Sequence, residues 1–266
     1  MAYFLDRKGS LLGIPQETAS SAIDMMAVPI PEREVSSEGE LRGIVTSWMQ
    51  TIDGHRLWRE LADDGRLELV GGWILENYHY LRSSPRHVSA AIAACPDPII
   101  RDHLVAHLAE EAGHAEILAA ALTPFLAGRR PAEHRPLPTT DSFIGYLRDL
   151  ASADWKAYCV AITYLQMSYD SRDARHSGFY ERLSGRLPEA APLAHSMSRH
   201  DALDSELDHG TKLDLLAADL LGRHGVGPDS LGRAAMVAQL AWGFLDGILH
   251  HYQTPWSLRQ RVGWRG

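Results

Sequence analysis

Hydrophobic and polar positions follow a helical period along most of the chain, and the pattern is clearest at residues 103–122. At about 100° per residue, the side chains of Leu104, His107, Glu111 and His114 fall on one narrow stripe. A charged group that faces a hydrophobic core is costly unless it is paired or bound to a metal ion. The pattern therefore predicts one long helix whose buried face carries two histidines and a glutamate.

A second long helix is predicted at residues 192–221, where Glu206 and His209 lie three residues apart on the face that carries leucines. Facing helices that each project a Glu-x-x-His pair are typical of carboxylate-bridged iron sites in all-α proteins. We therefore expect Glu206 and His209 to meet Glu111 and His114 across one pocket.

A different stripe of the same predicted helix carries His200, Asp204 and Asp208. It lies about half a turn away from Glu206 and His209, so it is predicted to be a solvated face. The positions facing the core and the positions facing water are thus separated on this segment, and the expected ligands belong to the first group.

The remaining pattern is also helical. Ser37-x-x-Glu40 is a capping box that predicts the start of a helix. Pro98 predicts the start of the long helix that contains residues 103–122, and this helix is expected to end near Gly128. No run shows the alternation of a strand, which indicates an all-α fold of seven to nine helices. We expect one domain at 36–266, preceded by an arm or cap at 1–35. The further helices are predicted at about 37–50, 55–62, 67–81, 85–94, 154–169 and 229–252.

Composition narrows the function classes. The 266 residues carry a formal net charge of −8, which argues against nucleic acid or an anionic membrane as a partner. The two cysteines, Cys95 and Cys159, exclude a disulfide framework and a cysteine-based zinc site. They fit a cytoplasmic protein, and we find neither a signal peptide nor an apolar run of membrane-spanning length.

Residues 45–253 resemble the heme-oxygenase-like superfamily, most closely its branch of pyrroloquinoline-quinone synthase C proteins. The similarity is carried by a Gly65-Arg66-Leu67 turn, by Trp73 ahead of a tyrosine-rich helix, by the Cys95-Pro96-Asp97 step and by Glu206-Leu-Asp-His209-Gly. The resemblance implies a compact helical bundle around a central pocket, with no heme and with a homodimer as a common assembly.

The chemistry of that superfamily varies, so the fold does not give the function. The quinone-cofactor synthases are poorly matched, because Glu111 stands where the resemblance leads us to expect histidine and His107 where it leads us to expect arginine. Their lysine on the last helix is replaced by an apolar residue near Val237. The thiaminase II group uses a cysteine nucleophile, for which Cys159 lies on the right kind of helix.

The non-heme di-iron oxidases of this fold match better, through Glu111 and His114. Glu206 and His209 resemble the end of their His-x-x-x-Asp/Glu-x-x-His series, although its first histidine falls on Ala202. The resemblance also implies a carboxylate on the central helix. The candidates for it are Tyr164, Gln166 and Asp170, of which only Asp170 is acidic. The sequence is compatible with a site for one iron, with a site for two irons and with a descendant that binds no metal.

The sequence thus predicts an Fe²⁺-dependent oxidase or oxygenase that uses dioxygen on a small organic substrate, such as an amino acid or a natural-product intermediate. The alternatives are a metal-free oxidase or thiaminase-like hydrolase, and a non-catalytic binding relative. We predict His107 as a catalytic or pocket-lining residue. The substrate contacts are predicted at Glu76, Tyr80 and Tyr164, and the metal ligands at Glu111, His114, Asp170, Glu206 and His209.

Overall fold

The computed structural model describes residues 31–63, 66–176 and 178–253, and at 167–176 it describes the backbone alone. Eleven α-helices account for most of these residues. They are α2 (Glu38–Asp53), α3 (Arg56–Asp63), α4 (Leu67–Ala94), α5 (Pro98–Glu111), α6 (His114–Phe125), α7 (Pro138–Ala153), α8 (Trp155–His176), α9 (Phe179–Arg186), α10 (Ala191–Glu206), α11 (His209–His224) and α12 (Pro228–Tyr252), with short 3₁₀ helices at Pro131–Glu133 and Pro188–Ala190.

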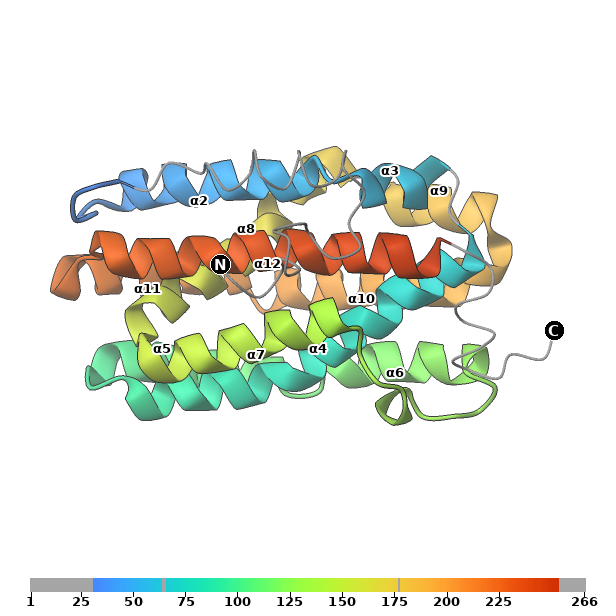
Figure 1. The fold of residues 1–266 in the computed structure, drawn as a ribbon, viewed down its shortest axis with the longest axis horizontal. Helices are drawn as coiled ribbons and strands as arrows, with labels where there is room; N and C mark the ends of the chain where they lie inside the picture. The colour runs from blue at the N-terminus through green and yellow to red at the C-terminus, as the bar shows by residue number, and fades with distance from the viewer. Residues whose placement is uncertain (1–30, 64–65, 177, 254–266) are drawn as a thin grey trace, which may run out of the picture.

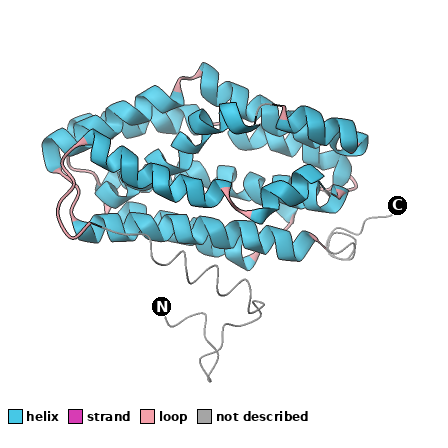
Figure 2. Cartoon of the chain, turned by 90° about the horizontal axis from the view of Figure 1, so that it is seen from above, coloured by secondary structure: helices cyan, strands magenta, loops and turns pink. Residues whose placement is uncertain are grey.

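The predicted all-α class is confirmed. The described residues form no strand, and their only β-type pairing is an isolated antiparallel bridge between Val35 and Val226 (Figure 2). Among the same residues, no helix combines the length and the apolar character needed to cross a lipid bilayer.

The helices lie roughly along the long axis of the molecule, in stacked layers (Figure 1). α4 packs against α5, α6 and α7, while α12 packs against α7 and α8. The predicted central helix is α8, in which all residues from 157 to 164 are buried. A helix that is apolar on every side is stable only when neighbours surround it, and α2, α7, α11 and α12 all contact α8.

The predicted helix starts at Ser37 and Pro98 are confirmed. The Ser37 hydroxyl accepts a hydrogen bond from the Glu40 amide, and the Asp97 carboxylate accepts hydrogen bonds from the amides at the start of α5. Asp97 also binds Arg223 and His224 at the end of α11, at 2.8 Å in each case. The beginning of one helix is thereby tied to the end of another.

The described helices number eleven rather than the predicted seven to nine, and several boundaries differ from the predicted ones. α4 runs through Pro85, so the helices predicted at 67–81 and 85–94 are one element. Buried side chains on both sides of Pro85 pack against the core and compensate for the backbone hydrogen bond that proline cannot donate. The predicted helices 103–122 and 192–221 are each broken into two, as described below.

Candidate metal centre

Two helix breaks shape the centre of the molecule. α5 ends at Glu111, Gly113 adopts a left-handed conformation with φ 97°, and α6 begins at His114. α10 ends at Glu206, Asp208 adopts φ 55°, and α11 begins at His209. Each break redirects the chain and places a histidine at the first residue of the new helix, where the direction of its side chain no longer follows the preceding turns.

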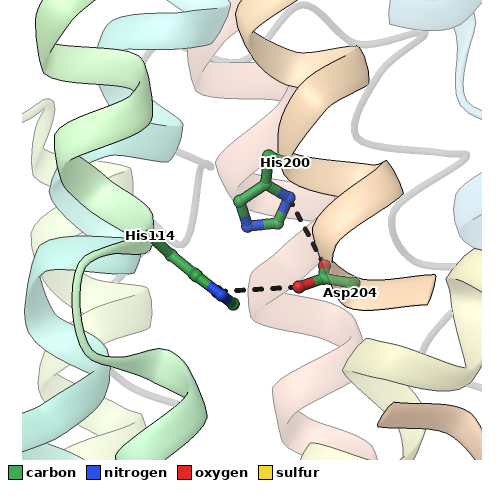
Figure 3. A group of neighbouring side chains, drawn as sticks. All are labelled: His114, His200 and Asp204. Carbon is green, nitrogen blue, oxygen red and sulfur yellow. Dashed lines mark ion pairs between the residues drawn. The ribbon is translucent and has the colours of Figure 1, made fainter. Parts of the chain in front are cut away.

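His114, His200 and Asp204 form a buried cluster in which one ligand atom from each lies within 4.8 Å of the others. Figure 3 shows His114, from α6, reaching across to Asp204 and His200 on α10. The Asp204 carboxylate lies 3.6 Å from His114 Nδ1 and 3.4 Å from His200 Nδ1. Its Oδ1 atom also lies 3.4 Å from His209 Nδ1, so three imidazoles surround one carboxylate.

Glu111 lies beside this cluster and is itself buried. Its carboxylate accepts a 2.8 Å hydrogen bond from the Gln166 side chain on α8, and its Oε1 atom lies 3.8 Å from His107 Nε2. Gln166, one of the three central-helix candidates, therefore contacts Glu111. The side chain of Asp170 lies outside the described residues.

Burial shifts the pKa values of most groups in the cluster. His200 is the exception, because burial alone would lower its pKa but Asp201, Asp204 and Glu111 raise it. Burial lowers the pKa of His114 to about 4 and that of His107 to about 3, so both rings are neutral at pH 7. It raises the pKa of Asp204 to about 7, against the opposite effect of His200. Burial likewise raises the pKa of Glu111 and lowers that of His209. Neutral imidazoles are the form of histidine that binds metal ions.

The residues present fit a metal ion. Within the described part of the chain, neither ring nitrogen of His114 makes a hydrogen bond, and neither does Asp204 Oδ1. Burying polar atoms without partners costs about 1–3 kcal/mol each. A divalent cation bound between the imidazoles and the carboxylate would satisfy these atoms together, and mixed imidazole and carboxylate ligands suit iron(II).

The structure brings together only part of the predicted ligand set. Glu111, His114 and His209 are buried around the centre, but Glu206 is exposed, and its prediction as a ligand is wrong. The reason is local geometry. Asp204 faces the core, and Glu206 follows it by two residues, or about 200° around the helix.

His200 and Asp204 are the site residues that sequence reasoning missed. They were predicted on a solvated face, but both are buried, and only Asp208 of that stripe is exposed. The sequence does contain the spacing of the expected ligand series, as His200-x-x-x-Asp204. This pair lies two residues before the positions predicted from Glu206 and His209. The break at Asp208 adds residues between Asp204 and His209, so the spacing of a continuous helix gave the wrong register.

A cavity of about 100 Å³ opens directly against the cluster. Its polar end contains Glu111, Gln166, His200 and Asp204, and its other walls are largely aromatic and aliphatic. These walls consist of Met49, Ile52, Trp58, Trp73, Asn77, Tyr80, Leu81, Phe143, Tyr164, Leu165, Ala241, Phe244 and Leu245.

Two of the three predicted substrate contacts, Tyr80 and Tyr164, line this cavity, whereas Glu76 does not. Glu76 is fully buried and accepts hydrogen bonds from the Tyr252 hydroxyl at 2.7 Å and from the Leu137 amide at 3.0 Å. It joins α4 to α12 and to the start of α7, so its prediction as a substrate contact is corrected to a structural role. His107, whose Nε2 atom lies 3.8 Å from Glu111 Oε1, is also absent from the described cavity wall.

Solved structures with a similar arrangement of helices are known. A domain of unknown function with a heme oxygenase-like fold from Shewanella denitrificans superposes with a TM-score of 0.64 at 17% identity, over 84% of this chain and 95% of that one. A TenA homolog from Pseudomonas syringae pv. tomato gives a TM-score of 0.59 at 11% identity, over 80% of this chain and 92% of that one. These identities establish the fold alone.

The predicted heme-oxygenase-like bundle is thereby confirmed. No curated protein matches the sequence. The model of the TENA/THI-4/PQQC family, however, matches residues 42–192, which is more than half of the chain and includes α5, α6 and the central helix α8. The chain therefore belongs to the TENA/THI-4/PQQC family.

Proposed function

We propose that this protein is a non-heme iron-dependent oxidase or oxygenase that uses dioxygen on a small organic substrate. The observation that carries the proposal is the cluster of His114, His200 and Asp204, of which His200 and Asp204 line a largely apolar cavity. Ligands of this kind leave coordination positions open for dioxygen, and the cavity offers space for a substrate beside them.

In this proposal His114, His200 and Asp204 hold one Fe²⁺ ion, and His209 and Glu111 complete the site or hold a second ion. Iron supplies the activation of dioxygen. The Gln166 amide, by donating to Glu111, fixes the direction of that carboxylate. Asp170 is still predicted as the carboxylate ligand from the central helix, and its side chain lies outside the described residues.

The other residues act on the substrate and its surroundings. The aromatic walls exclude water, which limits side reactions of activated species. Tyr80 and Tyr164 contact the substrate from the cavity wall. His107, whose Nε2 atom is 3.8 Å from Glu111, acts as a positioning residue for that carboxylate rather than as an acid or base on the substrate.

A metal-free reaction of the same fold is the second candidate. The observation that favours it is the pKa of about 7 at Asp204, because a carboxyl group that titrates near neutral pH suits general acid–base catalysis. Cysteine-based hydrolysis is not favoured, because Cys159 is buried, its thiol pKa is raised by burial and it does not belong to the described cavity wall.

Metal loading separates the two candidates. Wild-type protein incubated with Fe²⁺ without oxygen, and then freed of excess metal, is expected to retain about one or two ferrous ions per chain. Asp204→Asn and His114→Ala are expected to lose this binding. Glu206→Gln, a matched change on the exposed side of the same helix end, is expected to keep it.

Each result decides a specific point. Iron retained by Asp204→Asn, or lost from Glu206→Gln, would reject the ligand assignment. Wild-type protein that is folded by circular dichroism but holds no iron would favour the metal-free candidate. Uptake of dioxygen by the iron-loaded protein, stimulated by members of a panel of amino acids and amines and absent in His200→Ala, tests the oxidase activity itself.

A further inference from the structure

A glutamate and a lysine lie beside His209, on the side of its ring that faces away from Asp204. The ring reaches Asp204 Oδ1 through Nδ1 at 3.4 Å and Glu110 Oε2 through Nε2 at 3.1 Å. The other oxygen of Glu110 accepts a hydrogen bond from the Lys212 ammonium group. The three side chains thus form a chain of contacts that leads from the surface to the cluster.

Exposure changes along this chain of contacts. The Lys212 side chain is 45% exposed, that of Glu110 is 14% exposed, and that of His209 is 5% exposed. A partly buried carboxylate between an imidazole and an ammonium group is stabilised by the positive charge and restricted to one direction. Glu110 therefore holds a fixed carboxylate oxygen 3.1 Å from His209 Nε2. The two atoms do not form a hydrogen bond in the structure, and a rotation of the His209 ring would let Glu110 accept the Nε2 proton.

His209 needs such a partner because of where it lies. It is the first residue of α11 and follows Asp208, whose backbone is left-handed, so no preceding helical turn limits the direction of its ring. Glu110 comes from the last turn of α5, and Lys212 from the first turn of α11. Their contact joins the two helices at the point where the direction of the ring must be set.

A neutral imidazole carries its proton on one nitrogen and a lone pair on the other. When a carboxylate accepts the Nε2 proton, the lone pair is left on Nδ1, which faces Asp204. Partners of this kind orient metal-binding histidines and raise their basicity, and their removal weakens metal binding by about 10–100-fold.

We propose that Glu110, fixed by Lys212, is a positioning residue that selects the Nε2-protonated tautomer of His209 and directs its Nδ1 atom towards the metal. This inference rests on the proposed function. It assigns to Glu110 a role outside the ligand set, and it gives Lys212 the role of fixing the position of Glu110.

Titration with Co²⁺, followed by its visible absorption, tests the proposal. Glu110→Ala is expected to weaken Co²⁺ binding by about 10–100-fold. Glu110→Gln keeps an acceptor but loses the charge, so it is expected to lose less, and Lys212→Met is expected to fall between wild type and Glu110→Ala. The matched control is Glu116→Gln, an exposed glutamate on α6, which is expected to bind as wild type does.

A second measurement reads the tautomer without metal. ¹⁵N spectra of the histidine rings, with His209 identified by its loss in His209→Asn, are expected to show the Nε2-protonated form in wild type and a mixture in Glu110→Ala. A structural role for Glu110 would lower thermal stability in Glu110→Ala without changing the tautomer.

The outcomes distinguish a failure of the proposed role of Glu110 from a failure of the proposed function. Wild-type protein that binds Co²⁺, with Glu110→Ala binding equally well or keeping a single tautomer, would overturn the role of Glu110 and leave the proposed function standing. Wild-type protein that binds neither Co²⁺ nor Fe²⁺ would overturn the proposed function, and the positioning role with it.

Discussion

At the scale of single residues, Glu76 shows how a buried carboxylate acquires a role from its partners. The hydrogen bonds that it accepts from the Tyr252 hydroxyl and from the Leu137 amide come from residues far away in sequence. The close approach of α4 and α12 at this level is allowed by Gly72, where an added Cβ atom would meet the Tyr252 ring at 2.2 Å. The carboxylate therefore contributes to helix packing rather than to the cavity.

Glu76→Gln is expected to lower the free energy of unfolding by about 1–3 kcal/mol, because the new amide group presents a donor where the carboxylate accepted two hydrogen bonds. Urea unfolding measures this change. Metal affinity should stay at the wild-type value, since Glu76 is not part of the described cavity wall. A loss of metal binding without a loss of stability would restore the original prediction of a site role.

The ligand residues were predictable in part for a physical reason. His114 and Glu111 lie on the apolar side of their helix, so their burial follows from the hydrophobic pattern alone. The choice between Asp204 and Glu206 did not follow from it. Both residues lie within one turn of a helix end, where a shift of two positions reverses which of them faces the core.

At the scale of elements, the two breaks decide the site. The predicted helix 103–122 assumed a constant period, but Gly113 leaves the helical region and His114 begins a new element. Glycine suits this position because a φ of 97° is accessible to it at little cost. At Asp208 a non-glycine residue adopts the left-handed conformation, which aspartate tolerates better than most residues.

Gly113→Ala is expected to cost about 1–2 kcal/mol, because a Cβ atom strains the left-handed conformation even though no atom would lie within 4 Å of it. Thermal or urea unfolding measures the cost. Gly43→Ala is the matched control: Gly43 is an exposed residue inside α2, also without close neighbours, and its replacement is expected to stabilise by up to about 1 kcal/mol.

The same pair of variants tests the link between the break and the site. Gly113→Ala is also expected to weaken metal binding, since the backbone at Gly113 sets the direction of His114, whereas Gly43→Ala is expected to leave it unchanged. If Gly113→Ala and Gly43→Ala were equally stable, a side chain at position 113 would not strain the left-handed backbone there.

At the scale of the whole molecule, burial of neutral histidines couples stability to pH. Apart from the cluster, His79 and His87 are buried, and burial lowers the pKa of each to about 4. His87 Nδ1 lies 2.7 Å from the Tyr158 hydroxyl, deep between α4 and α8. In the unfolded chain the same rings have a pKa of about 6.5.

The folded state therefore binds fewer protons than the unfolded state between about pH 6.5 and pH 4. Stability is present above pH 6.5 and is lost as the pH falls through this range, by an amount on the order of 3 kcal/mol for each ring. Urea unfolding of the metal-free protein at several pH values measures this slope. His87→Asn should be less stable at pH 7 but show a shallower slope, and a slope as steep as that of wild type would exclude His87 as its source.

The sequence by itself determined the helical class and the burial of α8, because apolar periodicity is a local property that any packed arrangement must respect. Its resemblance to a known superfamily, rather than its periodicity, implied the heme-oxygenase-like bundle. The sequence also directed Glu111, His114 and His209 inward. Only the tertiary structure decided that His200 and Asp204 join them and that Glu206 and Glu76 do not. Two backbone breaks and the contacts between distant helices set the directions of these side chains. A helical period predicts which way a side chain points only as long as the helix is continuous.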